Sequence, residues 1–462
     1  MRKYAVALMV AGLVMVAAFS AMGAIAQAGS GKNQTVQQPS VKVNEPAPEK
    51  PIADAKWTVM VYLDGDNNLE TYAMKDLAEL EKVGSKNGVN VIVLMDTLTL
   101  LSGTHWYFIG EGVKHVDLAN GTNDCDCAEI AGACPGELNM GDGATLTYFV
   151  RTAMAYAPAE NYMLVMWDHG GGWYGVCWDD SSLLPDGRSD RLTVDELGNA
   201  LVAALDGTGK RLSIIGYDAC LNSMIEVAYE NRKVADYMVA SVTMIPGDGW
   251  SYDGMLEKLT ADPTVDAPTL GKIVVDTYID YYSVCAGSGT GGMGSVELGV
   301  LDLAKVEALA VGAGGINDLA NALMPYASIS SYRGAIESAE SQTPMLELYG
   351  EAFAFIDIGH FATLLGQKIP ELKSLTDSAF ELLEAAVLYH RSVSTAMGPI
   401  LDTNGLTIYF TCSWYYLYED YGYDTYEESE AAGALPYYGM DFAADTSWDE
   451  FLMAFSVCQS GA

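Results

Sequence analysis

The first half of the chain alternates apolar runs of strand length with segments whose apolar residues recur at helical spacing. Almost every position in the runs is apolar, which is typical of strands buried on both faces of a sheet. The runs cover residues 57–63, 89–96, 162–167, 212–217 and 237–242, and residues 105–109 with 113–116 suggest an edge hairpin. Helical spacing falls between them, near residues 69–80, 146–153, 197–204 and 221–228. This alternation predicts parallel crossovers and an α/β sandwich.

The second half of the chain has mainly helical patterns. Helices are predicted at about 268–283, 303–326, 350–366 and 370–391, with strands at 292–300 and 406–411. We therefore expect a catalytic core over residues 56–253 and a mostly helical C-terminal subdomain over residues 254–462 packed on it.

Two of the apolar runs stop at residues that can do chemistry. The first ends in Trp167-Asp-His169-Gly-Gly-Gly-Trp173, and the second ends in Tyr217-Asp218-Ala-Cys220-Leu-Asn-Ser223, so that 51 positions separate the histidine from the cysteine. Open α/β sheets place their sites at the carboxyl ends of strands. Apolar residues after Cys220 at helical spacing predict a helix that starts there, whose dipole would lower the thiol pKa.

These residue types suit covalent catalysis. A thiolate of Cys220 is a nucleophile and His169 can take or give its proton, which forms an activated Cys–His pair. The amides of Gly170 and Cys220 are predicted to hold an oxyanion. The competing interpretations are a buried structural histidine and an inert core thiol.

Several ordered motifs resemble those of clostripain-like cysteine endopeptidases, within the caspase–gingipain–legumain superfamily. The His169 and Cys220 motifs carry most of the resemblance. Further matches are Trp57 to Glu70, Ser241 to Tyr252 and Gly405 to Phe410. The resemblance implies a caspase-like three-layer sandwich with a mainly parallel sheet. It also implies cleavage after Arg or Lys through an acyl-enzyme.

The resemblance assigns further roles. Asp218 would look into the primary specificity pocket and pair with a guanidinium or ammonium group; the alternative is a strand-end Asp that bonds nearby backbone. Ser241, Asp248 and Trp250 are expected to help line the cleft. Similar enzymes are zymogens cut in the loop after the histidine strand, where Arg188 and Arg191 are candidate sites; a merely exposed loop is the alternative.

The charge balance limits the partners. The chain has 24 Lys and Arg against 61 Asp and Glu, a net charge of −37. Such a chain repels nucleic acid and anionic membranes and attracts basic peptides, although the excess also serves solubility. We expect a monomer whose substrates are peptides or proteins with basic residues. A transpeptidase or ligase of the same fold, or a non-catalytic acidic surface-binding protein, remains as an alternative function.

The N-terminus has the pattern of an export signal. Residues 1–28 combine a basic start, an apolar stretch and a small-x-small sequence that ends at Ala28, which predicts a cleaved signal peptide and a secreted or cell-surface protein. An uncleaved membrane anchor is the alternative. Residues 29–55 are polar and proline-rich, which indicates a linker or pro-segment.

No metal site is predicted from the motifs. The run Asp64-Gly-Asp66-Asn67-Asn68 lacks an EF-hand pattern, so turn formation and a capping box from Asn67 to Glu70 are the preferred interpretation. We expect that no cofactor is required. A role for calcium is implied only by the resemblance to the family.

Seven cysteines remain besides Cys220, so at least one of them stays unpaired. They are Cys125, Cys127, Cys134, Cys177, Cys285, Cys412 and Cys458. For Cys125, Cys127 and Cys134, a local disulfide is favoured over zinc ligation together with His115. Their connectivity cannot be predicted.

Overall fold

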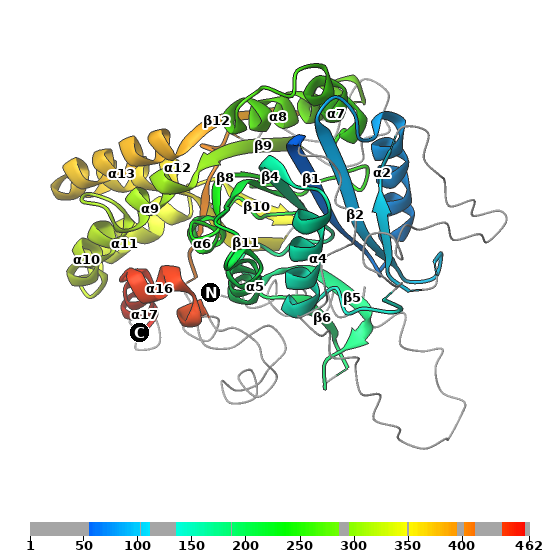
Figure 1. Ribbon diagram of the computed structural model, residues 1–462. Coiled ribbons are helices and arrows are strands. Elements are labelled where there is room, and N and C mark those ends of the chain that lie inside the picture. The colour runs from blue at the N-terminus through cyan, green and yellow to red at the C-terminus, as the bar shows by residue number, and fades with distance from the viewer. Residues whose placement is uncertain are drawn as a thin grey trace.

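One twisted sheet of eight strands runs through the middle of the molecule (Figure 1). The computed structural model describes residues 55–101, 103–110, 135–185, 187–285, 295–348, 351–394, 402–411 and 437–457. The strand order is β12-β9-β8-β7-β4-β1-β2-β3. The predicted signal peptide and all but the last residue of the predicted linker lie outside the described residues.

Five central strands of the sheet are parallel. They are β1 (Ala55–Gly65), β2 (Val89–Thr97), β4 (Ala159–Trp167), β7 (Leu212–Asp218) and β8 (Ala235–Ala240). Antiparallel strands complete the edges: β3 (His105–Phe108) on one side, β9 (Ser295–Asp302) and β12 (Val387–Ser394) on the other. The sheet therefore continues past residue 253, because β9 and β12 come from the second half of the chain.

Helices cover both faces of the sheet, which makes three layers. Successive side chains of β1 serve opposite cores, with Met60 and Tyr62 on one face and Val59 and Val61 on the other. The second face is covered by α2 (Glu70–Val83), α7 (Tyr252–Ala261) and α8 (Ala267–Cys285). The first face is covered by α4 (Gly143–Tyr156), α5 (Val194–Leu205), α6 (Ile225–Asn231) and α9 (Leu303–Val311).

The rest of the second half is mostly helical, as predicted. Its helices are α10 (Ile316–Ala327), α11 (Ser330–Glu340), α12 (Ile358–Lys368), α13 (Lys373–Ala386), α16 (Asp441–Asp445) and α17 (Trp448–Val457). A small sheet joins β10 (Met345–Leu348), β11 (Glu351–Asp357) and β13 (Thr407–Tyr409). Short 3-10 turns occupy Gly172–Tyr174 (η1), Pro370–Leu372 (η2) and Tyr437–Gly439 (η3).

Three predicted helices of this half are wrong in part. The helix predicted over 303–326 is two helices, because the chain turns at the glycines between α9 and α10, where Gly314 has a φ of +80°. The segment predicted as a helix over 350–366 begins as β11, and the one over 370–391 ends as β12. Pairing of β12 with β9 decides this last segment, and such long-range pairing is invisible in a local apolar pattern.

The segment predicted as an exposed loop after Trp173 is instead a hairpin. Strand β5 (Val176–Leu183) pairs with β6 (Ser189–Leu192). Asp179 fixes the hairpin to the core, because its buried carboxylate accepts N–H groups from Met140 and Ser182. The turn-forming residues that suggested an exposed loop therefore belong to a hairpin that includes a buried, hydrogen-bonded acid.

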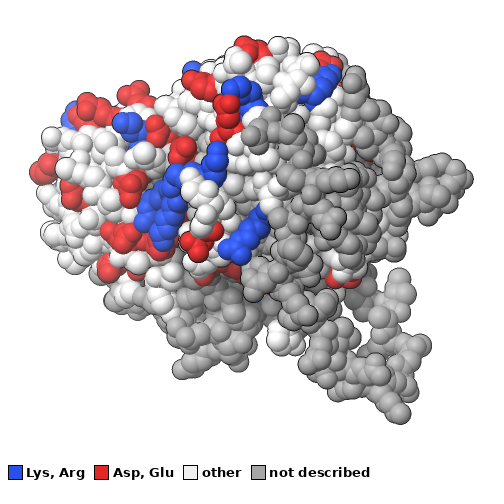
Figure 2. All heavy atoms as spheres, in the orientation of Figure 1, with Lys and Arg blue, Asp and Glu red and all other residues white. Residues whose placement is uncertain are grey.

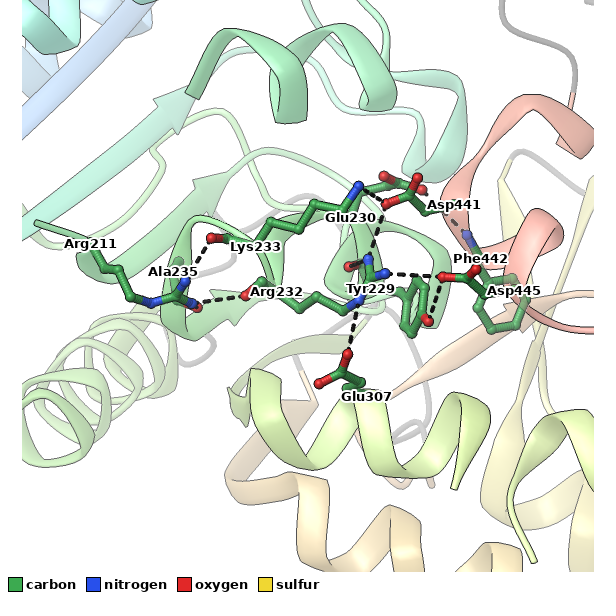
Figure 3. A network of polar contacts seen from close by, with 10 residues as sticks. All are labelled: Arg211, Tyr229, Glu230, Arg232, Lys233, Ala235, Glu307, Asp441, Phe442 and Asp445. Atoms are coloured by element: carbon green, nitrogen blue, oxygen red, sulfur yellow. Dashed lines mark hydrogen bonds and ion pairs between the residues drawn. The ribbon is translucent and has the colours of Figure 1, made fainter. Parts of the chain in front are cut away.

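Ion pairs connect α16, near the end of the chain, to α6, the helix that follows Cys220. The guanidinium of Arg232, at the end of α6, lies 3.5 Å from the ring centroid of Tyr229 and pairs with Asp441 and Asp445 of α16 (Figure 3). It also reaches Glu307 of α9. Residues far apart in the chain thus support one short helix.

The surface carries charges of both signs despite the acidic balance. On the face in Figure 2, Lys and Arg side chains gather in a stripe among Asp and Glu. None of the helices in the described part of the chain has the length and hydropathy needed to cross a bilayer.

Candidate active site

The two chemistry-bearing motifs follow neighbouring parallel strands. Strand β4 pairs with β7, with Trp167 opposite Asp218. Two residues beyond each of these partners stand His169 and Cys220. The amide of Asp168 lies 3.4 Å from the carbonyl oxygen of Asp218, so the ladder continues to the last strand residue. The sheet therefore delivers both residues to one edge.

Gly170 packs directly against the backbone of Cys220. A Cβ on Gly170 would lie 2.3 Å from the carbonyl oxygen of Cys220, 2.8 Å from its amide nitrogen and 2.3 Å from Nδ2 of Asn222. Only a residue without a side chain fits this approach. The backbones of Gly170 and Cys220 consequently border the same small space.

Cys220 does not begin a helix, so that prediction is wrong. Helix α6 starts at Ile225, and between them the chain makes a turn in which Leu221 has a φ of +69°. The thiol therefore does not stand at the first residue of a helix. The Sγ atom lies 3.3 Å from the amide nitrogen of Ile245, and burial raises the pKa of Cys220 to about 11. The cysteine is a protonated thiol at neutral pH in this state.

His169 is held from the other side, by the loop after β1. Its Nε2 lies 2.8 Å from Oδ1 of Asn68. Burial lowers the pKa of His169, and Asp180 opposes that shift. In the described residues no hydrogen bond joins His169 to Cys220. The sequence predicts the turn that contains Asn68 but not its contact with His169.

Asp218 lies at the end of β7, buried beneath the loop that covers Cys220. Its Oδ2 accepts the amide of Trp250 at 2.9 Å and the hydroxyl of Tyr252 at 3.0 Å. Its Oδ1 is buried without a hydrogen-bond partner. Burial raises the pKa of Asp218 to about 7. A buried acceptor without a donor is a place where a cationic group would be stabilised.

A second buried acid, Asp76 of α2, was missed from the sequence. Its Oδ2 accepts the indole N–H of Trp167 at 2.7 Å. A Cβ on Gly249 would lie 2.7 Å from that oxygen and 2.8 Å from Oδ2 of Asp218, so the glycine lies between the two acids. Burial, and then Asp218, raises the pKa of Asp76. Helical periodicity shows only that Asp76 adjoins the apolar Leu77, so no local signal marks it.

The other expected cleft residues have unequal positions. Ser241 is fully buried, 3.0 Å from Oγ1 of Thr243. Trp250 is buried as well, with its ring over Gly216 of β7. Asp248 is exposed and pairs with Lys75 of α2 at 3.0 Å. Of the three side chains, only that of Asp248 faces solvent.

The two candidate cut sites lie in the β5–β6 hairpin. Arg188 stands just before β6, next to Gly187, whose φ is +86°. Arg191 lies within β6, and its Nε donates to the carbonyl of Tyr174 at 2.8 Å. Arg188 is therefore the one at the turn.

The loop after β1 forms turns as expected, but the predicted capping box from Asn67 to Glu70 does not form. Asp64 accepts the amide of Asp66, and Asn67 accepts that of Leu69. Glu70 instead accepts N–H groups at Thr99 and Leu100.

A group of acids at the ends of β1 and β2 could hold a metal ion. One carboxylate oxygen from each of Asp66, Asp96 and Glu137 lies within 4.8 Å of the other two. Sequence reasoning saw no ligand cluster, because these residues come from three separated segments.

Two cysteines are described with their side chains, Cys177 and Cys220, and both are free thiols. Cys125, Cys127, Cys134, Cys412 and Cys458 lie outside the described residues, so their pairing stays a prediction.

The chain is similar to known proteins over most of its length. The model of the clostripain family matches residues 61–455. Clostripain from Hathewaya histolytica is 32% identical over 230 residues, which are 45% of this chain and 42% of that protein. The match thus spans less than half of the relative's length.

Solved structures share the fold. A secreted C11 cysteine protease from Bacteroides thetaiotaomicron, in complex with an irreversible peptide inhibitor, has a TM-score of 0.57 at 21% identity, over 86% of this chain and 100% of its own. An inactive zymogen C11 protease from Parabacteroides distasonis has a TM-score of 0.56 at 18% identity, over 86% and 99%. The predicted caspase-like sandwich is therefore confirmed. Since the family model covers most of its length, the chain belongs to the clostripain family.

Proposed function

We propose that the protein is a cysteine endopeptidase that cleaves after Arg or Lys, with Cys220 as the nucleophile and His169 as the acid and base. The observation that carries the proposal is the pairing of β4 with β7, which brings the two motifs to one sheet edge. The close approach of Gly170 to the backbone of Cys220 supports it, because it brings the two motifs into contact beside the nucleophile.

The reaction begins when His169 takes the proton of the Cys220 thiol. Sulfur then attacks the scissile carbonyl carbon, and the carbonyl oxygen becomes an oxyanion that the amides of Gly170 and Cys220 stabilise. His169 gives its proton to the leaving amine as the C–N bond breaks. Water then attacks the acyl-enzyme, giving one proton to His169, and the C–S bond breaks to regenerate the cysteine.

The described state is a resting state in this proposal. His169 contacts Asn68, and the Cys220 thiol lies against Ile245 with a raised pKa. Activation therefore requires His169 to exchange Asn68 for the thiol. We propose that a cut after Arg188 or Arg191 in the β5–β6 hairpin permits this exchange, so that the chain is made as a zymogen. An inactive zymogen among proteins of the same fold is consistent with it.

The preference for basic residues rests on Asp218. Its buried Oδ1 has no donor, and a guanidinium or ammonium group from the substrate would supply one. Asp248, exposed and close to Lys75, is a second acid that a basic side chain would meet on entry. Trp250 supports Asp218 by donating its backbone amide to Oδ2, whereas Ser241 acts only indirectly, through its buried contact with Thr243.

We also propose that the protein is exported as a monomer after its signal peptide is cut near Ala28. Its substrates are basic peptides. The chemistry above needs no cofactor. Calcium has no step in it.

The test uses fluorogenic peptides with Arg, Lys, Leu or Asp before the scissile bond. The Arg and Lys peptides should be cleaved, and Cys220→Ala should lose at least about 10³-fold in kcat/KM. Cys177→Ala is the matched control, because it removes another free thiol outside the proposed dyad. Retained activity in Cys220→Ala, or no cleavage by the processed wild type, would reject the proposal.

A further inference from the structure

The loop after His169 contains few side chains that could hold it in place. The next three residues are all glycine, which loses the most conformational freedom on folding, and Gly172 has a φ of +63°. Trp173 is the first residue of this loop with a side chain, and its indole is buried. The position of the glycine loop, residues 170–174, therefore depends strongly on what Trp173 packs against.

Trp173 packs into a cluster of aromatic rings from the second half of the chain. Its ring centroid lies 5.3 Å from that of Tyr409 in β13 and 5.2 Å from that of Tyr437 in η3. Tyr437 meets the indole edge to face, at an interplanar angle of 89°, which is a favoured arrangement for aromatic pairs. Residues distant in the chain thus anchor the glycine loop.

The hydroxyl of Tyr437 reaches the other catalytic motif. Glu226, in the first turn of α6, is completely buried, and its Oε1 accepts the Tyr437 hydroxyl at 2.7 Å and the amide of Tyr409 at 2.9 Å. Its Oε2 is buried without a partner, and burial raises the pKa of Glu226 to about 7. The two donors on Oε1 therefore compensate for much of the cost of burying this acid. They also fix the start of the helix that follows Cys220.

The turn after Cys220 touches the glycine loop directly. A Cβ on Gly172 would lie 2.4 Å from Sδ of Met224, the last residue before α6. Met224 also forms a parallel bridge with Thr407, at the start of β13. The glycine loop, the turn after Cys220 and β13 therefore meet at one place, and Tyr437 contacts a side chain or ring from each segment.

The segment that carries Tyr437 is attached to α6 at both of its ends. Its first residue donates to Glu226 at the start of the helix. Its last residue, Asp445, pairs with Arg232 at 3.1 Å at the end of the helix and accepts the hydroxyl of Tyr229 at 2.9 Å (Figure 3). The side chain of Arg232 is only 11% exposed, so solvent and salt screen its ion pairs less than those of a surface arginine.

We propose that Tyr437 is a positioning residue for the catalytic pair. Its ring fixes the glycine loop after His169 through Trp173, and its hydroxyl fixes the turn after Cys220 through Glu226. The contacts stand on the structure alone, whereas their effect on catalysis rests on the proposed function.

Positioning of this kind suits the exchange that activation requires. His169 has to move from Asn68 to the thiol, and the amide of Gly170 next to it has to stay beside Cys220 to hold the oxyanion. Because Tyr437 acts on the backbone beyond His169, it lets the imidazole turn while the glycine loop keeps its place.

Steady-state kinetics measure the positioning effect. Tyr437→Phe removes the hydroxyl and keeps the ring, whereas Tyr437→Leu removes both. In the processed enzyme, kcat for an Arg peptide should fall about fivefold in the first and at least about 30-fold in the second. KM should stay within about twofold, because the pocket acid Asp218 takes its donors from other segments. Tyr389→Phe is the matched control, because it removes a hydroxyl that donates to Asp276 at 2.8 Å at the β12 edge of the sheet.

A measurement without substrate separates this inference from the proposed function. Hydrogen exchange is followed by mass spectrometry in the full chain carrying Cys220→Ala, for peptides that cover residues 170–175. The amides of Gly171, Tyr174 and Gly175 form the hydrogen bonds of this loop. Their exchange should be at least about tenfold faster with Tyr437→Leu, about threefold faster with Tyr437→Phe, and unchanged with Tyr389→Phe.

The outcomes decide between the two levels. Thermal unfolding shows which variants fold, and if Tyr437→Leu does not, Tyr437→Phe decides alone. Unchanged loop exchange, an unchanged kcat, a loss confined to KM, or an equal loss in Tyr389→Phe would overturn the positioning role. Faster loop exchange in a protein whose processed wild type cleaves no peptide would reject only the proposed function.

Discussion

The cysteine half and the histidine half of the site end on neighbouring strands, yet their buried acids are stabilised differently. On the cysteine side, Asp218 accepts two donors and Asp76 accepts one, all supplied by the chain. On the histidine side, neither carboxylate oxygen of Asp66 has a donor within hydrogen-bond distance. The acids of the cysteine half therefore take most of their donors from the chain and leave Oδ1 of Asp218 open, whereas Asp66 in the histidine half leaves both oxygens open.

The largest effect is expected where the two halves touch. Gly170→Ala would force a Cβ into the backbone of Cys220, so kcat/KM for Arg peptides should fall at least about 10³-fold. Gly198→Ala in α5 is the control, because its nearest neighbour would be 4.0 Å away. Thermal unfolding shows whether both variants fold. A folded Gly170→Ala enzyme within threefold of wild type would mean that the halves do not meet as we describe.

Asp218→Asn tests whether the buried carboxylate of the cysteine half binds the basic side chain of the substrate. Its amide keeps the volume but cannot form an ion pair, so cleavage after Arg should fall about 10²-fold. Asp76→Asn should cost less than tenfold, because Oδ2 of Asp76 already accepts the indole N–H of Trp167 and the residue supports the pocket indirectly. Equal losses in the two variants would show that the pair acts as one unit, and an unchanged preference would move the pocket elsewhere.

Alkylation of Cys220 tests whether Cys220 and His169 already form an ion pair in the unprocessed chain. The unprocessed chain with Arg188→Gln and Arg191→Gln is treated with iodoacetamide from pH 6 to pH 8, and Cys220 is quantified by peptide mapping. With a pKa near 11, the thiolate fraction and hence the rate should rise about tenfold per pH unit. A rate that is level over this range would indicate a preformed thiolate–imidazolium pair.

Asn68→Ala tests the histidine half alone. Because His169 must leave Asn68 to reach the thiol, loss of this contact should raise the kcat of the unprocessed chain about tenfold and leave KM nearly unchanged. Asn321→Ala, on the exposed side of α10, is the control. A fall in kcat would show instead that Asn68 orients His169 in the active enzyme.

The smallest effect concerns stability at Glu297, an acid of the cysteine half that is not fully satisfied. Oε2 accepts the amide of Val242, but Oε1 has no partner, and burial raises the pKa of Glu297 to about 8 from 4.5. Between these values the folded state retains a proton that the unfolded state has lost, so stability falls as pH rises through this window.

Glu297→Gln should remove that pH dependence. The variant should match wild type near pH 4.5 and exceed its free energy of unfolding by about 1–3 kcal/mol at pH 8, as measured by urea unfolding. Equal stability at both pH values would mean that the carboxylate has a donor in solution.

Much of the fold could be predicted because buried strands and amphipathic helices leave local patterns. The apolar runs before His169 and Cys220 predict the two central strands β4 and β7. The polar residues at the ends of these runs predict the candidate chemistry. The segments at 350–366 and 370–391 were partly wrong because β11 and β12 exist through pairing with distant strands. The helix expected at Cys220 was wrong because Leu221 turns into the left-handed region first.

The sequence by itself determined the order of elements, the family motifs and the identity of a histidine and a cysteine at strand ends. Those features depend on residues close together in the chain. Only the tertiary structure decided that Asn68 contacts His169, that Asp76 lies near Asp218, and that Asp66, Asp96 and Glu137 converge. Burial and charge proximity arise between segments that the sheet brings together, so pKa values and candidate ligand sets are properties of the fold.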